Sequence, residues 1–266
     1  MSKHGSARVV LAGAAIAATL AVAGCGGVPK GTRPDVPGEN AGGTGAAAAS
    51  SRLSGTAQPD TLQGAAAAKS FAKANSIPFP VAVGNTWTYQ TQAGGQTGRT
   101  TNRIVAAGPG SGGYRVTVSS TTDFGGSGST VVPVYTFYPN GTIGYPVPPV
   151  SGVPVTGFDI RWPDAAGLAS GKVYRSTLHI KGGDADITVQ GVGTTSVSVP
   201  AGTYRASVVK ATITAQGQTI EVTVWIAQGT GPVKTEAVIR APGGTDLTTS
   251  ELLSFTKAVS VVGDGS

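Results

Sequence analysis

The 266-residue sequence contains a single cysteine, Cys25, and only two histidines, His4 and His179. One cysteine cannot form an internal disulfide, so a folded domain must be held together by packing and hydrogen bonds alone. Zinc and copper sites are usually built from several Cys and His side chains. Because these ligands are too few, we expect no metal site of that kind and no other cofactor.

Charge is also scarce, at 12% of the residues, with a formal net charge of +6. Lys3 and Arg8 lie in the predicted signal peptide described below, so the mature chain carries 17 basic and 13 acidic residues. The basic residues are scattered singly along the chain. Proteins that bind nucleic acids usually cluster Lys and Arg, because neutralising phosphates drives their affinity. The sequence therefore indicates no nucleic-acid partner.

The apolar run near the N-terminus is too short for a permanent membrane span. It covers residues 9–23 and would rise only about 22 Å as a helix, against a hydrocarbon core of about 30 Å. It follows a short basic segment, residues 1–8, as in a secretory signal peptide. Residues 1–24 are therefore predicted to be a signal peptide that is removed on export.

This run ends in Val22, Ala23, Gly24 and Cys25, which together resemble the lipobox of bacterial lipoproteins. In that motif, small residues precede a cysteine whose thiol takes a diacylglycerol group, and a dedicated peptidase then cuts before it. The only cysteine of the chain stands at this position. We expect a lipoprotein anchored in the lipid bilayer through the acyl chains of Cys25, on the extracytoplasmic face of the cell membrane, because two acyl chains give stable attachment.

The stretch after the anchor, residues 25–60, is rich in Gly, Ala, Pro, Ser and Thr and almost lacks large apolar side chains. Such a segment cannot bury enough apolar surface to offset the entropy lost on ordering. It is predicted to be a disordered tether. A short Ala-rich helix is expected over 61–76, and residues 259–266 are assigned to a tail.

Between residues 80 and 258 the apolar side chains recur with a period of two. Trp87 and Tyr89 alternate with Thr and Gln residues, and the same alternation recurs over residues 114–119, 186–190 and 219–226. Strict alternation indicates half-buried antiparallel strands. The predicted fold class is mainly β, a single antiparallel curved sheet that forms a half-barrel, a barrel or a sandwich.

Turn signals separate the predicted strands. Asn140-Gly141, between a strand over 131–138 and another over 142–145, is a strong hairpin signal. Residues 200–202 and 229–232 have the composition of tight turns, and Gly pairs separate other runs. Roughly ten to twelve strands are predicted in all.

Four short motifs carry a family resemblance. They are VGNTWTY at 83–89, VPAGTY at 199–204, VWIAQGTGPVK at 224–234 and ELLSF at 251–255. Their order resembles a group of uncharacterised bacterial envelope proteins, many of them lipoproteins, found in actinobacteria and elsewhere. The resemblance implies a curved antiparallel sheet similar to the half-barrel of lipoprotein carriers and mycobacterial lipid-binding lipoproteins, and it brings no catalytic residues.

Some predicted strands carry large apolar side chains on both faces. Trp225 lies opposite Val224 and Ile226, and Tyr135 lies opposite Val134. Either a second core layer covers the extra face, or aromatic residues line a groove for an acyl chain or another apolar ligand. The candidates for such a groove are Trp87, Tyr89, Tyr135, Phe137 and Trp225.

Evidence for catalysis is weak. Ser-x-x-Lys, a spacing used by penicillin-interacting enzymes, occurs at 70–73, 207–210 and 254–257. That spacing needs a helical turn, and the last two lie in strand-like runs, where positions three apart face opposite ways. We therefore expect no enzyme, but a membrane-anchored lipoprotein that binds an apolar ligand, a lipid or an envelope protein. The alternatives are a structural or assembly subunit of an envelope complex and, less favoured, a secreted serine-type hydrolase.

Overall fold

The computed structural model describes residues 80–110, 112–139, 142–146, 157–161, 167, 170–180, 183–215 and 217–258. The predicted signal peptide with its lipobox, Cys25, the tether, the helix over 61–76 and the tail over 259–266 lie outside these residues. Among the residues described, none belongs to a helix that is long and apolar enough to cross a membrane.

The described chain is almost entirely β-structure, and its strands form one antiparallel sheet. In chain order the strands are β1 (Thr86–Ala93), β2 (Gln96–Gly110), β3 (Gly113–Phe124), β4 (Ser127–Val131), β5 (Val134–Phe137), β6 (Thr142–Pro146), β7 (Gly157–Arg161), β8 (Val173–Ile180), β9 (Gly183–Val199), β10 (Gly202–Ala215), β11 (Gln218–Ala227), β12 (Gly231–Ala241) and β13 (Gly244–Thr256). The predicted mainly β fold with a single antiparallel curved sheet is confirmed. The strands in the described ranges number thirteen, slightly more than predicted.

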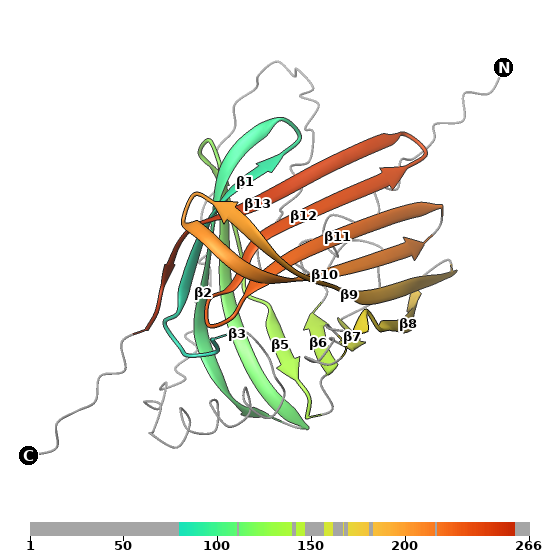
Figure 1. Cartoon of the computed structure of the whole chain (residues 1–266), viewed down its shortest axis with the longest axis horizontal. Coiled ribbons are helices and arrows are strands. Elements are labelled where there is room, and N and C mark those ends of the chain that lie inside the picture. The colour runs from blue at the N-terminus through green and yellow to red at the C-terminus, as the bar shows by residue number, and fades with distance from the viewer. Residues whose placement is uncertain are drawn as a thin grey trace, which may run out of the picture.

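The spatial order of the strands is β7-β6-β5-β3-β2-β1-β13-β12-β11-β10-β9-β8, with β4 paired to β3. Figure 1 shows the sheet curving strongly around one inner face. The two end strands, β7 and β8, come into contact without a hydrogen-bonded ladder between them. The sheet is therefore a nearly closed barrel rather than a sandwich of two sheets.

Four β-bulges help to bend the longest strands. In each, one strand carries an extra residue that has no partner across the ladder: Val105 in β2, Val192 in β9, Val233 in β12 and Leu253 in β13. A bulge bends its strand and increases the local twist. Strands of up to 17 residues can thus follow the curve of the barrel.

The alternating pattern places the apolar side chains on the inner face. Val222 and Leu252 are fully buried there at 0% exposure, and the outward residues of the same strands are half-buried or exposed. Burying one such aliphatic side chain stabilises a fold by about 1.5–3 kcal/mol. The inner face, built by all parts of the sheet, is therefore the core of the domain.

The prediction of one continuous strand over 131–138 is wrong in one respect. The range contains the last residue of β4 and the whole of β5, with a break between them. β4 ends at Val131 and β5 begins at Val134, and Pro133 lies between them. Proline has no N–H to donate to a ladder. Its carbonyl instead accepts a hydrogen bond from Val118 N at 3.0 Å. β5 does pair antiparallel with β6, as a hairpin requires; Asn140 and Gly141 themselves lie outside the described residues.

The predicted turn at 200–202 forms the tip of a long hairpin between β9 and β10. In Figure 1 this hairpin bends back toward β12 and β13, and β9 contacts both of those strands. Ala201 N, at the tip, donates a hydrogen bond to Leu252 O at 2.9 Å. The hairpin therefore adds a second layer against part of the barrel.

Candidate functional site

The aromatic residues of β1 join three of the sequence motifs at one place. Trp87 Nε1 donates a hydrogen bond to Thr230 O at 2.6 Å, and Tyr89 Oη donates one to Pro232 O at 3.0 Å. Phe255 stacks on Trp87 with ring centroids 5.1 Å apart. The turn that presents these carbonyls has Gly231 at φ 93°, a conformation that favours glycine. These motifs thus hold the fold together.

Four of the five groove candidates lie in the core. Trp87, Tyr89, Tyr135 and Phe137 are all buried on the inner face and belong to one hydrophobic cluster. Burial raises the pKa of the Tyr89 and Tyr135 phenols well above their usual value, because it disfavours the phenolate. The structure brings these four side chains into one core and places the fifth, Trp225, elsewhere.

Trp225 lies on the outer face of the barrel and is half-buried. Its neighbour across the ladder on β10 is Val208, which is buried, and Lys234 Nζ lies 5.4 Å from the centre of its ring. Burial lowers the pKa of Lys234, but hydrogen bonds to Glu236 and Glu251 raise it more, so that its pKa is raised overall. Trp225 is therefore partly covered by side chains of its own sheet.

The most unusual part of the inner face is a set of buried polar side chains, here called the inner polar cluster. Its members are uncharged, fall on five neighbouring strands (β12, β13, β1, β2 and β3) and are at most 6% exposed: Thr91, Thr100, Asn102, Ser120, Thr122, Thr235 and Ser250. Buried polar groups are normally hydrogen-bonded, since burying them without partners is unfavourable. The hydrogen-bond partners of each member therefore decide whether its burial is unfavourable.

Four hydroxyl groups of the cluster satisfy one another. Thr122 Oγ1 lies 3.1 Å from Thr100 Oγ1, which lies 3.0 Å from Thr91 Oγ1. Thr91 Oγ1 in turn lies 3.1 Å from Ser250 Oγ. This chain of hydrogen bonds runs across β3, β2, β1 and β13, the middle of the sheet. It fixes the side-chain rotamers along one edge of the cluster.

Three other members have no hydrogen-bond partner within the described part of the chain. Both side-chain atoms of Asn102, and the hydroxyls of Ser120 and Thr235, are buried without one. Asn102 and Ser120 are direct partners across the β2–β3 ladder, which places their Cβ atoms about 5 Å apart. A buried donor or acceptor left without a partner costs about 1–3 kcal/mol. The inner face thus offers an amide and two hydroxyls that a bound molecule could engage.

Apolar rings border these polar atoms. Trp87 is the ladder partner of Asn102, and Tyr89 is the partner of Thr100. No residue of the cluster is titratable, so it contains no general acid or base and no counter-charge. The arrangement suits a neutral hydrogen-bonding group attached to an apolar body.

The inner polar cluster was not predicted from the sequence, although a signal was present. Thr100 and Asn102 share the face of the buried Ile104, and Ser120 and Thr122 share the face of the buried Val118. Because the strands are polar on both faces in these stretches, the pattern resembles that of a solvated strand end. Only the curvature of the sheet shows that one of the two polar faces is enclosed.

Charged side chains lie on the outer face instead. Glu221 forms ion pairs with Lys210, at 3.3 Å, and with Arg240. The hydrogen bond from Arg240 is the main cause that lowers the pKa of the Glu221 carboxyl. Lys234 pairs with Glu236 at 3.0 Å and with Glu251 at 3.2 Å. Such exposed pairs stabilise a fold by at most about 1 kcal/mol each.

The Ser-x-x-Lys spacings are not arranged for catalysis where they are described. Lys210 lies on the outer face and binds Glu221, and Ser207, three positions away on the same strand, points to the opposite face. Ser254 and Lys257 are both exposed, and Ser70 lies outside the described residues. Over the described ranges, no group of three or more His, Cys, Asp or Glu could hold a metal ion.

One aromatic residue, Tyr174, lies where the end strands β7 and β8 meet. The Arg161 guanidinium carbon, at the end of β7, lies 5.7 Å from the centre of the Tyr174 ring on β8. Lys172 Nζ lies 5.3 Å from the same centre. The contact of Arg161 therefore links the two edges of the sheet where no ladder joins them, whereas Lys172 comes from the segment just before β8.

Comparisons with known proteins add little to this geometry. No family model and no curated protein match the chain. Two solved structures are similar to it: a predicted lipoprotein from Parabacteroides distasonis, with 17% identity and a TM-score of 0.47, and a predicted exported protein with a YmcC-like fold from Bacteroides fragilis, with 21% identity and a TM-score of 0.45. Each match covers 67% of this chain and 98% of the other. At these values the likeness does not bear on function.

Proposed function

We propose that this protein is a membrane-anchored extracytoplasmic lipoprotein, held by a diacylated Cys25, whose barrel binds a small neutral amphipathic molecule on its inner face. The main observation in support is that buried polar atoms of Asn102, Ser120 and Thr235 have no partner among the residues that the structure describes. The lipobox residues before the single cysteine support the anchor. The role is that of a binding protein rather than an enzyme.

The hydrogen-bonding groups of the inner polar cluster indicate which class of ligand it would bind. An Asn side chain offers donors and an acceptor, and each hydroxyl offers one donor and acceptor sites. The complementary group is a hydroxyl, ester or amide. A charged group would be taken out of water with no counter-charge in the cluster, which is strongly unfavourable. The adjacent Trp87 and Tyr89 rings favour an apolar body. A neutral lipid or lipid-like molecule combines both features.

The other two hypotheses find less support. An assembly role would use a free strand edge. The two end strands of the described sheet contact each other, with Arg161 over Tyr174, and the free edge of β4, which pairs with β3 alone, is only five residues long. A serine hydrolase would need a base beside its nucleophile. The polar groups of the cluster include none.

The test is to purify the mature lipoprotein from membranes, extract it with organic solvent and identify copurifying molecules by mass spectrometry. The Asn102→Leu variant keeps the size of the side chain and removes its polar atoms. Thr121→Val is the matched control, because Thr121 neighbours Ser120 in sequence but is exposed.

We expect a stoichiometric neutral amphipath with the wild-type protein and with Thr121→Val, and loss of most of it with Asn102→Leu. An equal amount bound by all three proteins would place the ligand elsewhere. Absence of any copurifying molecule, together with no thermal shift on adding neutral lipids, would refute binding at the cluster and leave ordered water as the partner of these atoms.

A further inference from the structure

One buried side chain holds both ends of the described chain together. Asn85 is fully buried, at 0% exposure. Its Nδ2 donates a hydrogen bond to Pro80 O at 2.8 Å, and its Oδ1 accepts one from Ala258 N at 2.8 Å. Pro80 and Ala258 are the first and last described residues. Pro80, from which the sequence leads back to Cys25, therefore lies at this end of the barrel.

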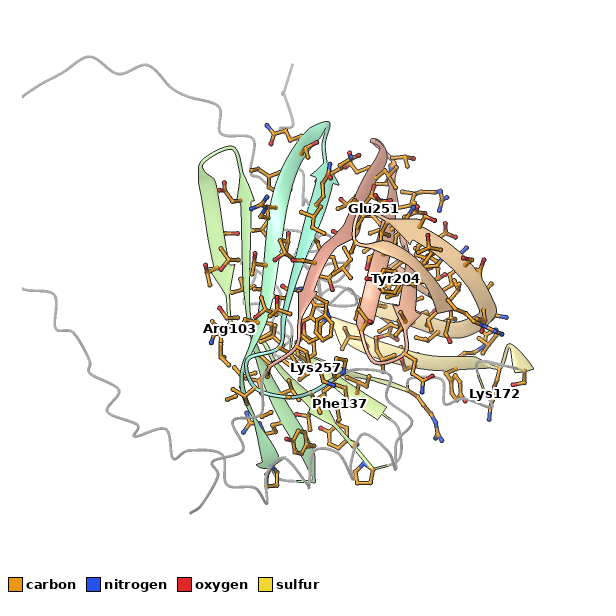
Figure 2. All side chains as sticks on the ribbon, turned by 60° about the vertical axis from the view of Figure 1, so that its left-hand side comes forward. Arg103, Phe137, Lys172, Tyr204, Glu251 and Lys257 are labelled. Atoms are coloured by element: carbon orange, nitrogen blue, oxygen red, sulfur yellow. The ribbon has the colours of Figure 1, made fainter. Side chains whose placement is uncertain are left out.

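Four exposed side chains, here called the basal surface, surround this junction: Val83, Arg103, Val105 and Lys257. The ladders bring them together, because Thr86 pairs with Arg103 on one side and with Thr256, next to Lys257, on the other. Gly84 N also donates to Ile104 O at 2.8 Å, which joins the segment of Val83 to that of Val105. Figure 2 shows Arg103 and Lys257 in the same part of the molecule.

The basal surface is positively charged. Within the part of the chain that the structure describes, neither Arg103 nor Lys257 forms an ion pair. The acidic residues on the neighbouring strands β3 and β13 lie further along the sheet. Asp123 is the ladder partner of Arg99, four positions before Arg103, and Glu251 is the ladder partner of Gln90, four positions after Thr86. Asp246 lies further still along β13, opposite Ile239. Val83 and Val105 add exposed aliphatic area, at 37% and 44%. Unpaired cations beside aliphatic side chains are typical of surfaces that lie at a lipid headgroup layer.

From these observations we infer that the basal surface docks on anionic lipid headgroups of the same membrane that holds the acyl chains. The inference rests on the proposed lipidation of Cys25. Fifty-four residues separate Cys25 from Pro80. The disordered tether predicted over 25–60 would have an end-to-end distance of about 33 Å, so it would permit contact without imposing an orientation. Each cation near an anionic surface favours the docked state by about fivefold.

The test uses the full lipidated protein in vesicles of phosphatidylcholine with or without phosphatidylglycerol. Acylation consumes the thiol of Cys25, so a cysteine introduced by Val83→Cys becomes the only free thiol and can carry an environment-sensitive fluorophore. Leu247→Cys is the matched control: Leu247 is 56% exposed on the same β13 strand that ends beside Lys257. It lies nine residues before Thr256, or about 30 Å.

We expect brominated lipids to quench the fluorophore at position 83 but not at position 247, and only when phosphatidylglycerol is present. Arg103→Gln with Lys257→Gln should reduce the docked fraction at least tenfold, and so should high salt. Equal quenching at both positions, or quenching that does not depend on phosphatidylglycerol, would overturn the inference. If the protein does not float with vesicles at all, the lipidation has failed instead, and the two failures are thereby told apart.

Discussion

The side-chain oxygen of Asn85 accepts the backbone N–H of Ala258 at 2.8 Å, across 173 positions of sequence. The same side chain donates to Pro80 O at 2.8 Å. Asn85 precedes β1, and Ala258 follows β13, the two strands that pair in the middle of the sheet. This one amide therefore joins the segment that precedes β1 to the segment that follows β13.

Replacing Asn85 by alanine should destabilise the domain by about 2–4 kcal/mol, because two hydrogen bonds are lost and their partly buried partners are left unsatisfied. Urea unfolding followed by circular dichroism gives the free energy. Thr88→Val, at an outward and half-buried position of β1, is the control and should change stability by less than about 0.5 kcal/mol. A loss below about 1 kcal/mol for Asn85→Ala would show that the clamp contributes little.

Asn102→Leu should stabilise the ligand-free protein, by about 1–3 kcal/mol, because it removes buried polar atoms that have no partner. Thermal unfolding of delipidated protein measures this effect. Thr91→Val is the matched comparison. Its hydroxyl contacts both Thr100 and Ser250, so the substitution should destabilise. If Asn102→Leu also destabilised the delipidated protein, the amide would have partners even without ligand.

Stability should fall at alkaline pH because of the buried phenols. Burial raises the pKa of Tyr89 in the folded state, while the unfolded phenol titrates near a pKa of about 10. The stabilisation is complete below that value, and above it stability falls by about 1.4 kcal/mol per pH unit for each such phenol. Tyr89→Phe should lose about 1 kcal/mol at neutral pH, for the bond to Pro232 O, and should show a shallower alkaline decline.

Urea unfolding from pH 7 to 12 tests this difference between the wild-type protein and the variant. Tyr135→Phe should flatten the alkaline decline in the same way, since burial also raises the pKa of Tyr135. Parallel stability curves for the wild-type protein and both variants would mean that these phenols ionise in the folded state.

Lys234 Nζ lies over the Trp225 ring, and we expect the side chain to stabilise the outer face mainly through its aliphatic stem. Lys234→Met keeps the stem and should cost about 1 kcal/mol or less, whereas Lys234→Ala should cost more and increase acrylamide quenching of Trp225. Lys210→Met, which removes only a more exposed ion pair with Glu221, is the control. Equal losses for the Met and Ala variants would assign the effect to charge.

The fold class was predictable because the signal for a half-buried strand is local. Residues 220–226 alternate in sequence and alternate in burial in β11, and the same holds for Trp87 and Tyr89 in β1. Turns at 200–202 were predictable from Pro and Gly. The break at Pro133 was missed, because the apolar residues on both sides of it read as one continuous run. Proline decided the outcome by having no N–H to donate.

The position of the candidate site was not predictable. Four residues predicted as groove candidates are buried in the core by the sheet: Trp87, Tyr89, Tyr135 and Phe137. Thr100, Asn102 and Ser120 look like ordinary surface residues in sequence, because polar residues stand on either side of them. Which of two polar faces is enclosed depends on the direction in which the sheet curves.

The amino-acid sequence by itself determined the predicted export signal and anchor at Cys25, the alternation that makes each strand and the turns that end them, because these properties depend on neighbouring residues. Only the tertiary structure decided that β1 and β13 pair in the middle of one nearly closed sheet. That pairing brings Asn85 to Ala258. The curvature of the sheet then buries Asn102, which the β1–β2 hairpin places opposite Trp87. The pairing of strands so far apart in sequence and the direction in which the sheet curves are properties of the whole sheet, which no local pattern encodes.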